Sequence, residues 1–165
     1  MTKTYDDLMA GFAGESQANR KYLAFAKKAD ADGFPQVARL FRAAAAAETV
    51  HALTHFRTAG EIRTTEENLK SAISGENYEN TIMYPGFIKD AEEEGDSKAL
   101  RSFTWANEAE KVHEMLYKEA LSTLGEPGEE YDYYVCPVCG HTHKRSAPDK
   151  CPICGTPGSR FEKIV

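Results

Sequence analysis

The sequence lacks any apolar run that approaches the roughly 18 residues needed to cross a membrane. Its first residues, MTKTYDDLMAGF, also lack the basic start and apolar segment of a secretory leader. Basic residues are in deficit, with 20 Lys and Arg against 26 Asp and Glu and a net charge of −6. This balance gives no electrostatic support for a nucleic-acid or anionic-membrane partner. We therefore expect a cytoplasmic protein that binds neither nucleic acid nor membrane.

Cysteine is absent from the first 135 residues, and four cysteines follow within the last 30. In a reducing compartment such a cluster indicates a metal site rather than two disulfides. Proline and glycine are scarce before residue 124, where Ala, Glu, Lys and Leu dominate and indicate helix. The segment 125–130, Gly-Glu-Pro-Gly-Glu-Glu, has the composition of a linker. The sequence thus predicts a helical domain at 1–126 and a small four-cysteine domain at 131–165.

Core-facing positions spaced three and four apart predict four long helices in the first domain. They span about residues 5–30, 35–58 and 76–94, and a fourth follows the stop and cap signal Gly95-Asp96-Ser97 and reaches about residue 124. Residues 61–75 bridge the second and third helices, with a short helix of their own expected at 66–73. Pro85 lies inside the third helix, where we expect a kink, the alternative being a true break at 84–86. Four such helices joined by mostly short turns predict an all-α antiparallel bundle.

Charged side chains interrupt the apolar faces of these helices. Glu48 and His51 form one Glu-x-x-His motif and Glu110 and His113 form another, and Glu15 lies on the apolar face of the first helix. The motif places a carboxylate and an imidazole one turn apart on one face. A buried carboxylate costs several kcal/mol unless it is paired or bound to a metal. Bound cations would remove that cost.

The spacing of these groups repeats. Glu15 and Glu48 are 33 residues apart, and Glu76 and Glu110 are 34 apart. One Glu-x-x-His motif arises often by chance on a charged helix, but two with matching partners predict a metal site. A glutamate from each of two helices and Glu-x-x-His from each of the other two is the ligand pattern of ferritin-like di-iron bundles. Oxygen ligands with two imidazoles favour iron or manganese over copper and permit zinc.

Glu79 supplies one carboxylate more than this pattern needs. It lies three residues after Glu76, so both side chains can face the site. A hypothesis follows, in which an iron shifts between Glu79 and the neutral imidazole of His51 as its oxidation state changes.

The four cysteines form two Cys-Pro-x-Cys-Gly knuckles separated by eleven residues: Cys136, Cys139, Cys151 and Cys154. This spacing is a strong signal for one tetrahedral metal. Alone, it is more often a zinc ribbon, but beside a di-iron bundle a one-electron iron site is favoured, with zinc substitution possible. Gly140 and Gly155 permit the tight turns after the knuckles. His141 and His143 lie between the knuckles, where we expect them exposed to solvent and not bound to metal.

These motifs, together with Gly14-Glu15-Ser16-Gln17-Ala18-Asn19 and the segment Gly75–Phe87, resemble those of the rubrerythrin family over nearly the whole chain. The resemblance implies a ferritin-like di-iron bundle followed by a rubredoxin-like iron domain. It implies reduction of hydrogen peroxide to water in oxidative-stress defence, and a head-to-tail homodimer or larger homo-oligomer. By this resemblance the di-iron ligands are Glu15, Glu48, His51, Glu76, Glu79, Glu110 and His113. Tyr22 and Tyr84 match family tyrosines near the metals, and either can hydrogen-bond a ligating carboxylate or simply pack in the core.

The electron source is expected to lie outside the chain, because no Gly-x-Gly-x-x-Gly nucleotide fingerprint occurs in it. A separate redox protein or NAD(P)H-dependent reductase would supply electrons through the four-cysteine iron. Two other interpretations remain open. One is an iron-storage or ferroxidase module, which would not require a dedicated electron relay. The other is a non-catalytic zinc ribbon attached to a structural bundle.

Overall fold

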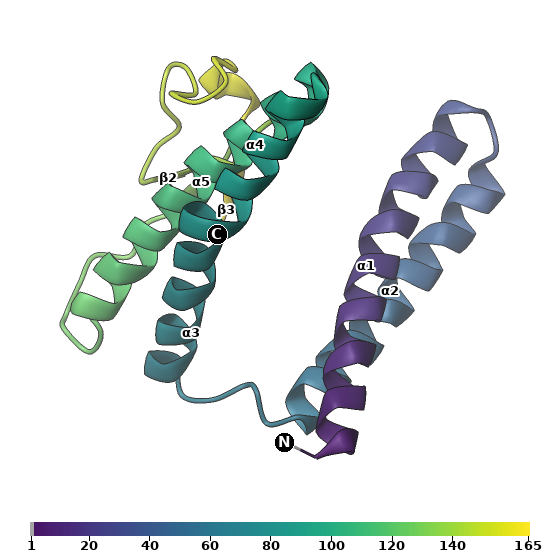
Figure 1. Cartoon of the computed structure of the whole chain (residues 1–165), viewed down its shortest axis with the longest axis horizontal. Coiled ribbons are helices and arrows are strands. Elements are labelled where there is room, and N and C mark those ends of the chain that lie inside the picture. The colour runs from purple at the N-terminus through teal and green to yellow at the C-terminus, as the bar shows by residue number, and fades with distance from the viewer. Residues whose placement is uncertain (1) are drawn as a thin grey trace. The chain divides into compact units, whose positions relative to one another are not determined.

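The structure is a computed structural model that describes residues 2–165. The chain forms two compact units, Met1–Arg63 and Thr64–Val165. Figure 1 shows the helices and strands of both units.

The first unit is a helical hairpin of α1 (Lys3–Ala31) and α2 (Pro35–Thr58). The Thr2 hydroxyl caps α1 by accepting a hydrogen bond from the Tyr5 backbone N–H at 3.3 Å. Gly33 adopts a left-handed φ of 81° in the turn between the helices, and Pro35 then starts α2 with its fixed φ. Both helices therefore lie close to the ranges predicted from the sequence.

Small side chains form the contact between α1 and α2. The most buried residues of the hairpin are alanines: Ala26, Ala38, Ala45 and Ala52. The amide of Asn19, also buried, donates hydrogen bonds to the Ala45 carbonyl at 2.7 Å and to the Thr49 hydroxyl at 2.9 Å. Alanine lets two helices approach closely, and the Asn19 bonds fix their register. That register also sets how Glu15 of α1 and Glu48 of α2 lie relative to each other.

The second unit begins with α3 (Thr65–Tyr78), a π-helical turn η1 (Glu79–Met83) and α4 (Tyr84–Glu94), followed by α5 (Ser97–Ser122). Thr64 and Glu67 form a reciprocal capping box at the start of α3. The Asp96 carboxylate caps α5 by accepting from the backbone N–H groups of Lys98 and Ala99. Both α3 and α4 pack against α5.

Two sequence expectations for the third helix are wrong. The structure has no separate helix at 66–73 and no helix start at Glu76, because α3 runs without interruption from Thr65 to Tyr78. Ser74 and Gly75 resemble a helix stop, but the capping box at Thr64 starts the helix earlier and it continues through them.

The chain also remains helical through Pro85, so the alternative of a break at 84–86 is wrong. The irregularity lies before the proline, in the π turn η1. Pro85 stands in the first turn of α4, where a missing N–H is best tolerated.

The cysteine-rich part of the second unit holds a small antiparallel sheet of order β2-β1-β3. The strands are β1 (Tyr133–Val135), β2 (Thr142–Lys144) and β3 (Glu162–Ile164), with a 3₁₀ turn η2 (Gly158–Arg160) before β3. In the register of the sheet, Tyr134 pairs with His143 of β2 and with Lys163 of β3. Three-residue strands of this kind have little stability alone, so other bonds must hold this part together.

Within residues 2–165, none of the helices is long and apolar enough to span a membrane.

Candidate metal centres

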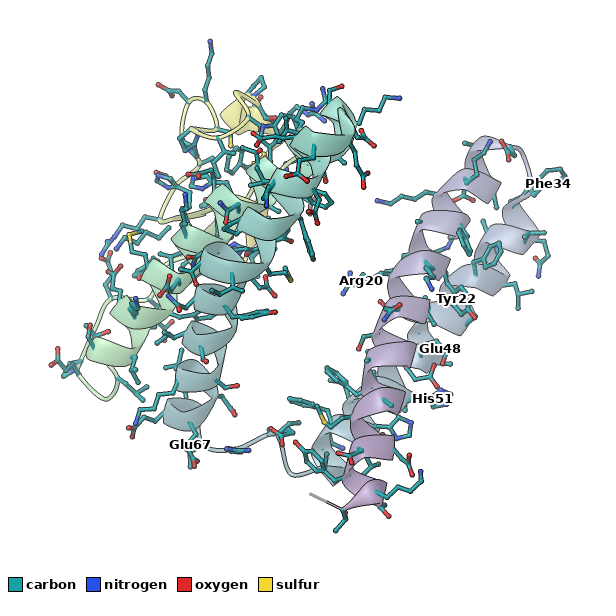
Figure 2. All side chains as sticks on the ribbon, viewed as in Figure 1. Arg20, Tyr22, Phe34, Glu48, His51 and Glu67 are labelled. Carbon is teal, nitrogen blue, oxygen red and sulfur yellow. The ribbon has the colours of Figure 1, made fainter. Side chains whose placement is uncertain are left out.

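The first unit gathers one group of metal-ligand side chains from both of its helices. Glu15 comes from α1. Glu48 and His51 come from α2, where they lie one turn apart (Figure 2). One potential ligand atom from each of the three lies within 4.8 Å of the others. His51 Nδ1 is 2.8 Å from Glu48 Oε2, and the His51 side chain is 56% exposed. We call this group the first triad.

The second unit gathers a matching group, the second triad, from α3 and α5. Glu76, Glu110 and His113 place their ligand atoms within the same 4.8 Å limit. His113 Nδ1 is 2.7 Å from Glu110 Oε2 and 3.9 Å from Glu76 Oε1. The side chains of this triad are only 16–25% exposed. Two carboxylates and an imidazole therefore converge in a partly buried place.

Burial and crowding perturb the charges of the second triad. Burial, followed by the hydrogen bond and charge of Glu110, raises the pKa of Glu76 to about 7. Burial also opposes ionisation of Glu110, but hydrogen bonds with His113 and Glu76 outweigh it and lower the Glu110 pKa. The hydrogen bond with Glu110 raises the pKa of His113. Without a metal, the triad thus needs bound protons to balance its carboxylates.

The other site residues predicted from the sequence are Glu79, Tyr84 and Tyr22. Glu79, in η1, has its pKa raised by burial and then by the charge of Glu110. Burial followed by the charges of Glu110, Glu79 and Glu76 raises the pKa of Tyr84, so its hydroxyl lies in their field. Tyr22 instead packs with Phe25 and Phe41, with ring centroids 6.4 Å and 6.2 Å away. The alternation of Glu79 and His51 as ligands stays a prediction.

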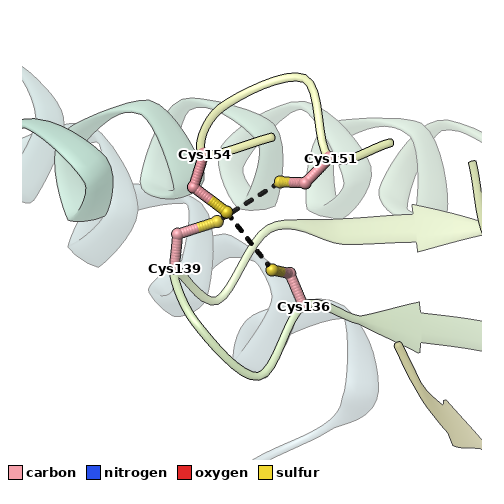
Figure 3. Close-up of side chains that lie close together, drawn as sticks. All are labelled: Cys136, Cys139, Cys151 and Cys154. Atoms are coloured by element: carbon pink, nitrogen blue, oxygen red, sulfur yellow. Dashed lines mark hydrogen bonds between the residues drawn. The ribbon is translucent and has the colours of Figure 1, made fainter. Parts of the chain in front are cut away.

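The four cysteines converge from two loops, as Figure 3 shows. Cys136 and Cys154 sulfurs are 3.6 Å apart, and those of Cys139 and Cys151 are 3.4 Å apart. All four are free thiols rather than disulfides. Tetrahedral coordination with metal–sulfur bonds of about 2.3 Å requires sulfurs roughly 3.8 Å apart. The cluster is therefore already close to the size of a four-thiolate metal site.

The loops shift the pKa values of the thiols in opposite directions. Burial raises the pKa of Cys139 and of Cys151, so that without a metal these two stay protonated at neutral pH. Burial opposes ionisation of Cys154, but hydrogen bonds from the Thr156 side chain and backbone help to lower its pKa to about 6. Gly140 and Gly155 take left-handed φ values of 79° and 75°, which confirms the predicted turns. The Gly140 N–H donates to the Cys136 carbonyl at 3.0 Å, and the Gly155 N–H donates to the Cys151 carbonyl at the same distance.

The expectation that His141 is exposed is wrong. The residue is 5% exposed, and its ring lies near the rings of His143 and Phe161. Its backbone carbonyl accepts a hydrogen bond from Cys136 N–H at 2.9 Å, which holds the loop inward. Burial lowers its pKa, so the ring is neutral at pH 7.

The sequence analysis missed two polar contacts of the second unit. The Asn80 amide donates to Glu114 Oε2 at 2.8 Å and to the Glu76 carbonyl at 2.8 Å, tying η1 to α5. His113 Nε2 lies 3.0 Å from the hydroxyl of Thr142 in β2. The contacts of Asn80 with Glu114 and of His113 with Thr142 have no sequence signal, because each joins residues that are about 30 or more positions apart.

The residues present fit metals at both kinds of site. Glu76 Oε2 is buried and has no hydrogen-bond partner within the described part of the chain, as expected for an oxygen that awaits a cation. The donor set of carboxylates and imidazoles suits iron, and four thiolates suit iron or zinc. The six triad residues and four cysteines would hold these metals.

Comparison with known proteins agrees with this chemistry. The family model named Rubrerythrin matches residues 6–121, and the model for the rubrerythrin rubredoxin-like domain matches residues 134–162. Nigerythrin of Nitratidesulfovibrio vulgaris is 41% identical, over 96% of this chain and 85% of its own. Rubrerythrin-2 of Clostridium acetobutylicum is 34% identical, over 96% of this chain and 95% of its own. A solved structure titled as the fully reduced, all-ferrous state of nigerythrin has a TM-score of 0.60 and 39% identity, covering 99% of this chain and 88% of that one.

These matches confirm the predicted fold class, an all-α ferritin-like bundle followed by a rubredoxin-like four-cysteine domain. They also support iron binding and an oxidoreductase with a di-iron centre. Because the Rubrerythrin model covers well over half of its length, this chain belongs to the rubrerythrin family.

Proposed function

We propose that the protein reduces hydrogen peroxide to water at a non-haem di-iron centre and receives its electrons through a rubredoxin-type iron. One observation carries this proposal: the second triad and the four-cysteine cluster lie in the same unit and are joined by the contact between His113 and Thr142. A storage module has no need for such a connection.

The ligands that we propose for the iron pair are the six triad residues and Glu79. When bound, the iron pair supplies two electrons and Lewis acidity for cleavage of the peroxide O–O bond. Two protons complete the conversion of one peroxide into two waters. The Tyr84 hydroxyl stays protonated because its pKa is raised, so it serves as a hydrogen-bond donor among the carboxylates. Tyr22 contributes to the aromatic packing of the first unit.

Cys136, Cys139, Cys151 and Cys154 hold the single iron of the relay in this proposal, and zinc can substitute for it. The proposed stoichiometry is two irons in the bundle, residues 1–126, and one in the domain at 131–165. The donor is an external redox protein or NAD(P)H-dependent reductase, and the setting is the cytoplasm. The proposed assembly is a head-to-tail homodimer or a larger homo-oligomer.

Anaerobic iron loading, metal analysis and rapid-mixing spectroscopy test the proposal. We expect three irons per chain and a ferric thiolate absorption band that bleaches on reduction and returns when peroxide is added. Glu110→Gln should keep the band but lose rapid reaction with peroxide, and Cys139→Ser should lose the band while retaining the bundle irons.

Two outcomes would favour the other interpretations. Oxidation by oxygen that is as fast as oxidation by peroxide, with accumulation of ferric mineral, would indicate a ferroxidase or storage protein. A colourless protein with stoichiometric zinc after iron loading would indicate a zinc ribbon on a structural bundle.

A further inference from the structure

The imidazole of His113 lies between two kinds of partner. Its Nδ1 faces the carboxylates of Glu110 and Glu76, and its Nε2 lies 3.0 Å from Thr142 Oγ1. Thr142 is the first residue of β2 and stands three positions after Cys139. A single imidazole thus joins the second triad to the loop of the four-cysteine cluster.

The direction of these hydrogen bonds follows from the partners. The Thr142 hydroxyl also lies 3.3 Å from the Gly140 carbonyl, which can only accept a hydrogen bond. The hydroxyl proton therefore goes to Gly140, and its oxygen accepts from His113 Nε2–H. The Gly140 carbonyl is also a partner of His113, because a backbone hydrogen bond with Gly140 helps to raise the His113 pKa. Both partners of Nε2 therefore accept, which places a proton on that nitrogen. In a neutral imidazole the lone pair is then on Nδ1, which faces the carboxylates. That tautomer is the one that a cation in the triad requires.

A second contact holds β2 in place on α5. Lys144 Nζ lies 2.5 Å and 2.6 Å from the two carboxylate oxygens of Glu119. Side chains two residues apart in a strand point to the same face, so Thr142 and Lys144 both contact α5. His113 and Glu119 are both on α5. The ion pair between Lys144 and Glu119 therefore helps to keep the Thr142 hydroxyl beside His113.

The contact lies at the edge of an apolar cavity of about 320 Å³. Besides His113 and Thr142, its lining includes Leu69, Leu116 and Tyr133. The polar partners of His113 Nε2 at this edge are the Thr142 hydroxyl and the Gly140 carbonyl. Loss of the hydroxyl would leave the N–H with the Gly140 carbonyl alone, which lies in the turn after Cys139, and would let the ring rotate or a water enter.

We propose that Thr142 is a positioning residue, which fixes the ring plane and the tautomer of His113 from within the four-cysteine domain of the same chain. The inference rests on the proposed function insofar as His113 is a metal ligand. Outer hydrogen-bond partners of metal-bound histidines commonly change metal affinity by about 10–100-fold when they are removed. Here that partner belongs to the four-cysteine domain, so the orientation of His113 depends on how β2 packs on α5.

The test uses the full chain loaded with Zn²⁺, which is diamagnetic, and compares Thr142→Val with Thr142→Ser. Long-range ¹H–¹⁵N spectra of the histidine rings report the tautomer of His113 and the exchange of its Nε2 proton. We expect Thr142→Val to speed that exchange and to weaken Zn²⁺ binding at the triad about 10-fold, and Thr142→Ser to restore both. The control is Thr104→Val, which removes an exposed hydroxyl from α5 that donates to the Leu100 carbonyl of the same helix.

An unchanged His113 tautomer, exchange rate and Zn²⁺ affinity in Thr142→Val would overturn the inference, as would equal losses in the valine and serine variants. Because these measurements need no peroxide, their outcome does not depend on whether the protein reduces peroxide. A wild-type protein that binds metal through His113 but does not react with peroxide would refute the activity and leave the role of Thr142 intact. In an active protein, slower return of the ferric thiolate band in Thr142→Val alone would further support the inference.

Discussion

Replacing Glu76 by glutamine should stabilise the metal-free protein at alkaline pH while destroying its metal site. The Glu76 side chain is 18% exposed, and its pKa is raised from 4.5 to about 7. Up to about pH 7 the folded protein therefore keeps this carboxyl neutral, whereas the unfolded chain ionises it above about pH 4.5. The contribution of the group to stability is present below pH 4.5 and is lost as the pH rises through 7.

The size of this loss follows from the shift. A rise of about 2.5 units at 1.36 kcal/mol per unit gives an upper limit near 3.4 kcal/mol. Solvent access and sharing of the effect with Glu110 reduce it to about 1–3 kcal/mol. Glutamine carries no charge at any pH. Glu76→Gln should thus exceed the wild type by this amount at pH 8, and the difference should shrink toward pH 5.

The assay is urea denaturation of chelator-treated protein at pH 5 and pH 8, followed by circular dichroism. Glu66→Gln is the matched control, because Glu66 is on the same helix, is 57% exposed and forms an exposed ion pair with Lys70. It should change stability by less than about 1 kcal/mol, with no trend between the two pH values. The reasoning is refuted if metal-free Glu76→Gln is less stable than the wild type at pH 8, or if its advantage is the same at pH 5.

Three further predictions concern the framework around the sites. Asn80→Ala should lower the free energy of unfolding by about 1–3 kcal/mol, because it leaves the partly buried Glu114 carboxylate without this donor; thermal melts would measure the loss. Gly95→Ala should cost about 1–2 kcal/mol, since Gly95 has φ 71° at the end of α4 and alanine is strained there; chemical denaturation would detect it. Removal of metal from the four cysteines should unfold residues 131–165 while α3–α5 stay helical, because three-residue strands cannot hold the loops alone; amide exchange would show whether protection is lost there only.

Much of the fold could be predicted because its signals are local. The first, second and fourth helices were placed within a few residues, since Pro35 and Asp96 mark helix starts that depend on neighbouring atoms alone. The third helix begins about ten residues before its predicted start, although its capping box at Thr64 and Glu67 is a local signal and nothing in the sequence between Thr64 and Tyr78 removes a backbone donor. Hydrophobic periodicity also does not reveal a π turn, because one extra residue per turn shifts the pattern without erasing it.

The candidate sites also combine local features, which the sequence predicts, with tertiary contacts, which it does not. Glu-x-x-His and Cys-x-x-Cys are short patterns whose geometry is set by a single turn of chain, so the sequence predicted which side chains would meet locally. The burial of His141 and the contact between Thr142 and His113 arise where the cysteine loop folds back on α5. Such contacts depend on tertiary packing, for which a single sequence carries no periodic signal.

The π turn at Glu79–Met83 decides which side chains share a face along the helix that contains it. In an α-helix each residue advances the chain by about 100° around the axis. Deleting one residue from this turn would rotate Tyr84 and Phe87 by that angle relative to Glu76. Tyr84 would then leave the field of the carboxylates, and Phe87 would lose its contact with Phe103, 5.4 Å away between ring centroids. The extra residue therefore keeps two groups of side chains on the face that packs against α5. These are the acidic side chains before and within the π turn and the aromatic side chains after it.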